Sequence, residues 1–273
     1  MMPARVDAIL PAGGRISGRF AAEAGAAVKA LIPLCDGRAV IERTLHTLRA
    51  TGRIGRVVVI GPAEVAGHPA AREADVVLPE GGSSGVANIM RGLQWLEEAN
   101  ADTRPDRVLV LTTDLPFFTP EAVTGFLDAC PSDLDICLPI IERKEFHARF
   151  PGLPVRFARL RDGHWVIGCA FLVNPTALGR NRRLIERAFA SRKSQILMAG
   201  LLGPLFIFRF LAGRLTVGMV EEQCLRLLGC TGKGIRGCPP ELAFDIDRRK
   251  DLHYVRTHCP DWERKNRHET GTP

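Results

Sequence analysis

Asp114 is a candidate functional residue because of its position in the sequence. It follows the apolar run RVLVLTT, residues 107–113, and precedes Leu115 and Pro116. An acid at the C-terminal end of a buried parallel strand points into the crevice where α/β proteins bind ligands. A carboxylate there suits Mg²⁺, which prefers hard oxygen donors and often binds carboxylates together with substrate phosphates. The alternative is a turn-forming aspartate that caps nearby backbone groups.

A second acidic motif, Asp245-Ile246-Asp247, also ends a short apolar run. In an extended segment alternate side chains share a face, so both carboxylates could point into one cleft. An isolated Asp-x-Asp motif is weak evidence for a functional site. Asp251, four residues further on, is expected in the first turn of a helix, where an acid interacts favourably with the helix dipole.

The cationic candidates lie in and after the loop that follows the first apolar run. Glycines after a strand let backbone N–H groups approach phosphate oxygens, and Arg15, Arg19 and Lys29 supply cations. Arg15 stands where a GxGxxG dinucleotide fingerprint needs glycine, and the loop is not a Walker A motif either. The alternative is a flexible glycine turn with solvated arginines. The loop residues that we expect to contact a nucleotide are Pro11, Ala12, Gly13 and Gly14.

A second glycine-rich loop, residues 81–85, leads into a helical pattern that contains Asn88. Small residues such as Gly82 would let a flat base lie against the backbone. Ser84 or Asn88 could then form hydrogen bonds with the edge of the base. The alternative is a loop that ends in a serine helix cap.

The first half of the chain alternates between strand and helix patterns. Apolar runs predict strands, and apolar residues at spacings of three and four predict amphipathic helices. The predicted strands are residues 6–10, 56–60, 74–78 and 107–113, and the predicted helices include residues 40–48 and 86–96. A further helix is predicted to begin at Thr119-Pro120-Glu121. This alternation indicates an α/β fold with a doubly wound, mostly parallel, Rossmann-like sheet covered on both faces.

The second half departs from that pattern. Residues 155–160 and 164–173 are expected to pair as strands across the turn Arg161-Asp162-Gly163, and residues 176–232 to form a helical insertion. The segment ELAFDID is strand-like, and a helix is expected from near Arg248. We expect one domain over residues 1–258 and a polar, frayed tail over 259–273.

Composition limits the classes of protein. Apolar residues make up 46% of the 273 residues, and 37 basic against 30 acidic residues give a net charge of +7. These values indicate a soluble globular chain with a preference for anionic ligands. The eight cysteines are scattered without a CxxC pair, so we expect mostly buried thiols, no zinc site and a cytoplasmic location. Three tryptophans and one tyrosine give little support to nucleic-acid binding.

Residues 196–211, ILMAGLLGPLFIFRFL, test the question of membrane contact. The apolar stretch is shorter than the ~20 residues that a spanning helix needs, and Gly203-Pro204 interrupts it. We expect a buried helical hairpin or kinked helix rather than membrane contact. A lipid-like substrate would favour an interfacial role instead. The sequence does not indicate an oligomeric state.

Taken in order, these motifs resemble the GT-A-like nucleotidyltransferases, and most closely the MobA-like NTP transferases. Residues 10–15 are similar to the LAAGxxxR motif of that family, 28–31 to PKxL, 113–116 to GDxP and 245–252 to DxDTPEDL. Pro11, Val28 and Thr113 depart from these motifs. Either Arg15 or Arg19 could take the role of the motif arginine, and either Asp245 or Asp247 could bind the metal.

The resemblance implies Mg²⁺-dependent transfer of a nucleotidyl group from an NTP to a phosphorylated small-molecule acceptor, with release of pyrophosphate. Asp114 and Asp247 would hold the metal. The first glycine loop, Arg15 and Lys29 would bind the triphosphate, while Gly82, Ser84 and Asn88 would lie at the base or ribose. Such a reaction depends on positioning and cationic stabilisation. The alternatives are a GT-A glycosyltransferase that uses a nucleotide sugar and a non-catalytic nucleotide-binding module.

Overall fold

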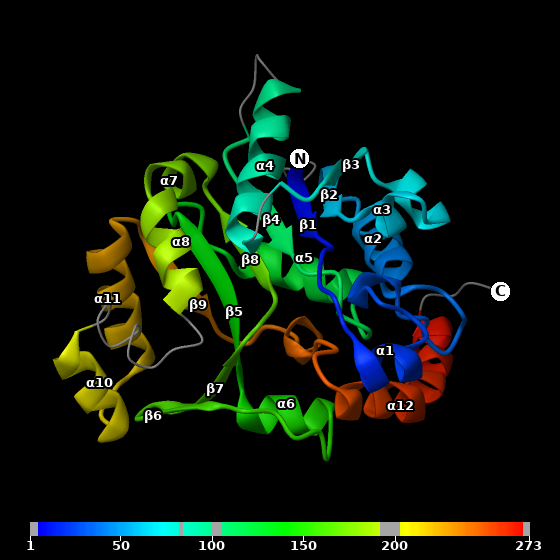
Figure 1. Ribbon diagram of the computed structural model, residues 1–273. Coiled ribbons are helices and arrows are strands. Elements are labelled where there is room, and N and C mark those ends of the chain that lie inside the picture. Colours follow the sequence, from blue (N-terminus) through cyan, green and yellow to red (C-terminus); the bar gives the residue numbers. More distant parts are fainter. Residues whose placement is uncertain (1–4, 82–83, 100–104, 192–202, 270–273) are drawn as a thin grey trace.

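A computed structural model describes residues 5–81, 84–99, 105–191 and 203–269 of the chain (Figure 1). The strands in the described residues join in one nine-stranded sheet. The strands are β1 (Val6–Pro11), β2 (Ile54–Gly61), β3 (Val76–Pro79), β4 (Val108–Leu111), β5 (Ile136–Glu142), β6 (Ala158–Leu160), β7 (Gly163–Ile167), β8 (Ala170–Val173) and β9 (Gly232–Ile235).

The helices alternate with the strands in the first half and cluster in the second. The helices are α1 (Gly18–Ala24), α2 (Val40–Ala50), α3 (Ala63–Ala66), α4 (Gly85–Glu98), α5 (Pro120–Ala129), α6 (Arg143–Arg149), α7 (Pro175–Arg180), α8 (Arg182–Ser191), α10 (Pro204–Leu211), α11 (Val217–Leu228) and α12 (Arg249–Glu269). Short 3₁₀ helices cover Lys29–Leu31, Pro69–Glu73 and Pro240–Ala243.

The central part of the sheet is parallel and positions the site. The strand order is β3-β2-β1-β4-β8-β5-β7-β6, and β9 pairs with β5. The pairs β2–β3, β1–β2 and β1–β4 are all parallel, so the carboxyl ends of these strands lie at one edge. β8 joins β4 in the antiparallel direction and begins the mixed remainder of the sheet. The predicted α/β fold with a mostly parallel central sheet is confirmed.

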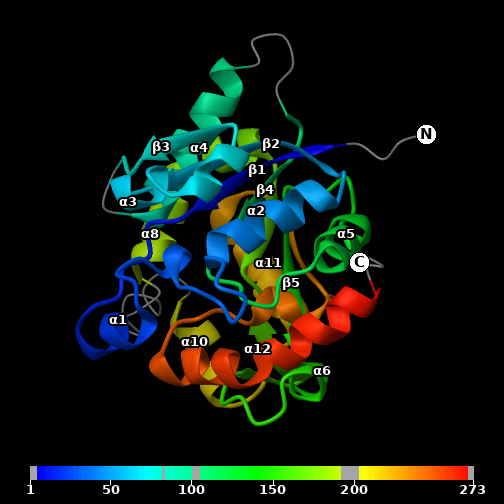
Figure 2. The same ribbon diagram turned by 90° about the vertical axis from the view of Figure 1, so that its right-hand side faces the viewer.

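Helices cover both faces of this sheet because alternate strand residues point to opposite sides (Figure 2). Leu10 and Val59 pack in one core cluster with Leu45 of α2, whereas Ile9 packs in another with Leu93 of α4. A Cβ atom at Gly92 of α4 would lie only 2.9 Å from the Ile9 side chain. Glycine at position 92 therefore allows α4 to lie close against β1.

The second half differs from two of the strand predictions. Residues 164–173 form two strands, β7 and β8, and only β7 pairs with β6 across the predicted turn. The strand-like segment ELAFDID forms no strand: Pro240–Ala243 is a 3₁₀ helix, and the residues after it extend without a ladder. Pro240 is the first residue of this 3₁₀ helix, a position that suits the fixed φ angle of proline.

The predicted insertion is helical in its described part, but its apolar helix is not buried. α10 contains no buried residue, and Phe208 and Leu211 are 62% and 77% exposed. The expectation of a buried hairpin is therefore wrong for residues 204–211, while residues 196–202 lie outside the described part. Among the described residues, no helix is long and apolar enough to cross a membrane.

The end of the chain is also more ordered than predicted. α12 continues to Glu269, so the expected frayed tail beyond Cys259 is wrong for the residues described. Cys259 is fully buried and forms a disulfide with Cys35, which corrects the expectation of thiols at these two positions. The Trp262 ring lies 5.6 Å from that of Phe117. α12 is thus anchored by a covalent bond and by aromatic packing.

Candidate active site

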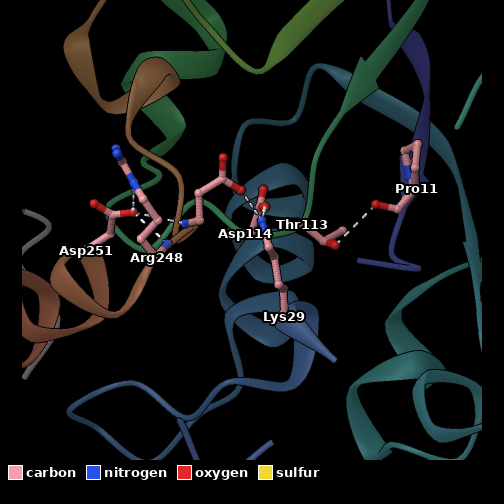
Figure 3. Close-up of polar contacts among 7 residues, drawn as sticks. Pro11, Lys29, Thr113, Asp114, Arg248 and Asp251 are labelled. Atoms are coloured by element: carbon pink, nitrogen blue, oxygen red, sulfur yellow. Dashed lines mark hydrogen bonds and ion pairs between the residues drawn. The ribbon is translucent and has the colours of Figure 1, made fainter. Parts of the chain in front are cut away.

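The candidate site lies where the strand order reverses, between β1 and β4. Ligands of open α/β sheets bind outside the carboxyl ends of the strands at such a point. The Thr113 hydroxyl, just after β4, donates a hydrogen bond of 3.3 Å to the Pro11 carbonyl oxygen at the end of β1 (Figure 3). This bond ties the two strand ends together, and Asp114 follows directly.

Three carboxylates converge at this point. Asp114, Asp245 and Asp247 each place one carboxylate oxygen within 4.8 Å of the others. The backbone supports this arrangement, because the Ile246 N–H donates to the Asp114 carbonyl oxygen at 3.0 Å. A backbone bond therefore holds together two motifs, at Asp114 and Asp245, that are 131 residues apart in the sequence.

Lys29 lies among these carboxylates. Its backbone N–H donates to the Gly14 carbonyl oxygen at 2.8 Å, which holds it against the first glycine loop. Its ammonium group forms ion pairs with Asp114 Oδ2, at 3.1 Å, and with Asp247 (Figure 3). Burial alone would lower the pKa of Lys29, but the neighbouring Asp114 and Asp247 carboxylates outweigh burial and raise it. Lys29 thus stays charged at neutral pH and offsets part of the local negative charge.

Asp245 lies close to the other two acids and is largely enclosed. Burial and the negative charges of Asp114 and Asp247 raise the pKa of Asp245 to about 7, although Lys29 acts in the opposite direction. Crowded carboxylates resist simultaneous ionisation, and a bound cation relieves that repulsion. Burial, together with the negative charges of all three aspartates, raises the pKa of the neighbouring Cys169 thiol.

Asp251 holds the segment Asp245-Ile246-Asp247 in place at its carboxyl end. This buried side chain accepts hydrogen bonds from the backbone N–H groups of Asp247, at 3.2 Å, and Arg248, at 2.7 Å. It therefore occupies the first turn of α12, as predicted, and satisfies N–H groups that a helix start would otherwise leave free. Through these bonds Asp251 positions the backbone of Asp247.

The donor set fits a hard divalent cation. Asp114 Oδ1 is buried and has no hydrogen-bond partner in the part of the chain that the structure describes. With Asp245 and Asp247 it offers an all-oxygen set, the kind that Mg²⁺ prefers. An unsatisfied buried carboxylate oxygen is costly, so a ligand for it is expected. Asp114, Asp245 and Asp247 could hold such an ion.

The first glycine loop brings backbone near this cluster, but Arg15 in the loop and Arg19 in α1 pair with other acids. Gly14 leaves room for Lys29, since a Cβ atom at Gly14 would lie 3.3 Å from Lys29 Cδ. Arg15 pairs with Glu64 at 3.2 Å and Arg19 with Glu23 at 3.0 Å. Lys29, whose backbone is bonded to this loop, is thus a cation that contacts the carboxylates.

Ser84 and Asn88, which we predicted to contact the nucleotide base, form local contacts at the start of α4. The Ser84 hydroxyl accepts a hydrogen bond from the Ala87 N–H at 3.1 Å, as a helix cap does. Asn88 Oδ1 accepts one from the Gly81 N–H at 3.0 Å. Gly82 lies outside the described residues. The contacts of these residues with a base stay a prediction.

Two cavities lie near these elements. A cavity of about 140 Å³ borders Asp245 and Asp247 and is walled by apolar residues of the β6–β7 region, including Val155 and Val166. A larger cavity of about 420 Å³ lies beside α4 and is lined by Gly81 and Trp95 but by none of the three carboxylates. We therefore associate the smaller cavity with the site. The sequence could not predict which residues line the smaller cavity. The β6–β7 region lines it together with residues 243–251, and such a long-range contact leaves no local pattern.

Several solved structures are similar to this chain. A hypothetical transferase from Thermus thermophilus is 32% identical, with a TM-score of 0.78, and the match covers 91% of this chain and 99% of that one. A nucleotidyl transferase from Methanothermobacter thermautotrophicus is 19% identical, with a TM-score of 0.55 and coverage of 96% and 100%. A CMP:2-keto-3-deoxy-manno-octonic acid synthetase complexed with CTP is 13% identical, with a TM-score of 0.55 and coverage of 94% and 99%.

The family comparison identifies the class more narrowly. Residues 8–196 match the model of the MobA-like NTP transferase domain. The chain belongs to the MobA-like NTP transferase domain family. Membership of this family supports a transferase of the nucleotidyl-transfer type. No curated protein matched the chain at a significant level.

Proposed function

We propose that this protein catalyses Mg²⁺-dependent transfer of a nucleotidyl group from an NTP to a phosphorylated acceptor, with release of pyrophosphate. One observation carries the proposal: Asp114, Asp245 and Asp247 gather around Lys29 at the carboxyl ends of β1 and β4. The CTP complex of a neighbour of similar fold supports an NTP as donor. A cytoplasmic location belongs to the same proposal.

Asp114 and Asp247 are the proposed ligands of the ion, with Asp245 the alternative to Asp247. When bound, Mg²⁺ would neutralise phosphate oxygens and charge that develops during transfer. Lys29 would bind the triphosphate and stabilise the negative charge of the leaving pyrophosphate. The backbone of Pro11, Ala12, Gly13 and Gly14 would approach the phosphates. An acceptor that is already a phosphate needs no general base, so the chain's task is to position two anionic groups.

The acceptor is proposed to bind in the 140 Å³ cavity beside Asp245 and Asp247. Its apolar wall includes Val155, Val166 and Phe244, while the exposed Arg248 lines the same cavity. An arginine beside apolar side chains suits a phosphate group attached to a partly apolar body. The proposed acceptor is therefore a small phosphorylated molecule with an apolar part.

Donor chemistry can be tested with NTPs that carry label at the α- or the γ-phosphorus. With Mg²⁺ and a panel of small organic phosphates, we expect the γ-label in pyrophosphate and the α-label in the product. Release of a nucleoside diphosphate from a nucleotide sugar, without use of an NTP, would instead establish the glycosyltransferase alternative. Binding of an NTP without turnover across the panel would favour the non-catalytic module.

The assignment of Lys29 over Arg15 can be tested on the same reaction. Lys29→Met should lower kcat/KM for the NTP on the order of 100-fold, because charge stabilisation at the phosphates is lost. Arg15→Met is a matched control, since Arg15 pairs with Glu64 rather than with the carboxylate cluster. Equal losses in both variants would contradict the assignment of Lys29 as the main cation.

A further inference from the structure

α10 presents a continuous apolar surface to the exterior. Seven of its eight residues, PLFIFRFL, are apolar, yet none is buried. Leu205, Phe208 and Leu211 follow at spacings of three, which places them on one side of the helix. Their exposed fractions are 60%, 62% and 77%. Phe210 adds exposed ring area, so these four side chains define the α10 surface.

Exposed arginines surround the α10 surface. Arg209 lies within the helix, and Arg214 follows it. The Arg161 N–H donates to the Leu215 carbonyl oxygen at 2.7 Å, which brings the β6–β7 turn and its exposed Arg161 to the end of this segment. Figure 1 shows β6 beside α10. Residues 204–215 contain no aspartate or glutamate.

The first acids after α10, Glu221 and Glu222, and Asp162 of the β6–β7 turn are already engaged. The Glu221 carboxylate accepts a hydrogen bond from the Gly234 N–H at 2.8 Å. Asp162 accepts from the Val217 N–H at 3.2 Å and pairs with Arg236 at 3.0 Å. Glu222 pairs with Arg226 at 3.5 Å. The arginines around the α10 surface therefore keep their positive charge available to an external anion.

We propose that α10 docks this protein onto the surface of an anionic lipid bilayer. Exposed phenylalanine and leucine favour the acyl boundary, and arginine favours anionic headgroups. An eight-residue helix is only about 12 Å long, so it lies on a bilayer and does not span it. A second copy of the chain fits less well, because a two-fold interface would bring identical arginines towards each other. The proposal is independent of the nucleotidyl-transfer chemistry, since α10 contributes none of the three carboxylates.

The test is sedimentation of the full chain with lipid vesicles. Vesicles of phosphatidylcholine mixed with phosphatidylglycerol should bind the protein, and raising the salt concentration should weaken binding, because salt screens the headgroup charge. Vesicles of phosphatidylcholine alone should bind it weakly. The double variant Phe208→Ser/Leu211→Ser should bind mixed vesicles about tenfold or more weakly, since it removes apolar area. Its Tm should stay unchanged, because neither side chain is buried.

Charge variants supply matched controls. Arg209→Glu and Arg214→Glu should each weaken binding about fivefold or more, the value of one basic residue near an anionic surface. Arg72→Glu makes the same charge change on an exposed residue of the 3₁₀ helix Pro69–Glu73, far from α10, and should bind like the wild type. Equal losses in all three variants would mean a general effect of net charge and would overturn the docking surface.

Two further results would overturn the proposal. One is a folded wild-type protein that does not sediment with mixed vesicles at low salt. The other is self-association, measured by sedimentation velocity without lipid, that Phe208→Ser/Leu211→Ser abolishes while no form binds vesicles. In that case a second copy covers α10.

Discussion

The parallel part of the sheet and the α10–α11 region place apolar and polar groups in opposite ways. Around β1 and β4, apolar side chains are buried on both faces, and carboxylates gather with Lys29 at the strand ends. In α10 the apolar side chains face outward, and arginine lies among them. The contrast is clear between α2, which buries Leu45 and Leu48, and α10, which buries nothing.

This difference indicates two kinds of requirement within one chain. The parallel part bears the cost of crowded charges at its strand ends, which stability alone would not favour. The α10 region bears the cost of exposed apolar area, which a solitary globular chain normally limits. Each of these two exceptions points to a ligand: an ion with phosphates at the strand ends, and a surface at α10.

The largest expected effect is the loss of catalysis on removal of a carboxylate from the site. Asp114→Asn should lower kcat on the order of 10³-fold or more, because it removes a charged oxygen proposed to hold the cation. The steady rate of pyrophosphate release measures this effect. Asp106→Asn, at an exposed position before β4, is the matched control and should retain wild-type activity. Unchanged turnover in Asp114→Asn would remove Asp114 from the reaction.

The second prediction compares the two helices directly. Leu45→Ala in α2 should lower the free energy of unfolding by about 2–5 kcal/mol, because it leaves a cavity in the core. Phe208→Ala in α10 removes a larger side chain but should change that free energy by less than about 0.5 kcal/mol. Urea denaturation of both variants measures the contrast. A loss in Phe208→Ala comparable to that in Leu45→Ala would mean that α10 is packed inside the protein.

The smallest effect concerns the pH dependence of stability in metal-free buffer. Asp245 has a folded-state pKa of about 7, well above the usual aspartate value of about 3.9. The folded protein therefore binds this proton more tightly than the unfolded chain. The stabilisation from Asp245 is complete below about pH 4 and is lost as pH rises through about 7, a change on the order of 1–3 kcal/mol.

Asp245→Asn isolates this contribution, because asparagine does not titrate. The free energy of unfolding of the wild type should fall relative to that of the variant between pH 4 and pH 8. Adding Mg²⁺ at pH 8 should reverse part of the loss in the wild type, since a bound cation offsets the carboxylate repulsion. Parallel pH profiles of the two proteins would contradict the proposed environment of Asp245.

Much of the parallel part could be predicted from local patterns. Runs such as residues 56–60 and 107–113 are apolar enough to specify buried strands, and the Thr119 cap with Pro120 specifies the start of α5. The ends of these strands then indicate where Asp114 lies. Its proximity to Asp247 did not follow from spacing, because it depends on the backbone bond from Ile246 to Asp114.

The remaining features depend on long-range contacts that leave no local pattern. The apolar content of α10 predicted burial, but burial requires a partner surface, and none covers Phe208 or Leu211 among the described residues. Cys35 and Cys259 pair across a separation of 224 residues, which no short spacing could indicate. Arg15 has the position of a motif arginine but pairs with Glu64 instead.

The most direct test of the central claim is a thermal-shift measurement with ATP, GTP, CTP and UTP, each with and without Mg²⁺, on the wild type and on Asp114→Asn. A ligand at one hundred times its Kd stabilises the folded state by about 2.7 kcal/mol, which raises the Tm measurably. We predict a rise in Tm with at least one NTP that requires Mg²⁺ and is lost in Asp114→Asn. No rise with any NTP, or an equal rise in the variant, would contradict an NTP–Mg²⁺ site at these carboxylates.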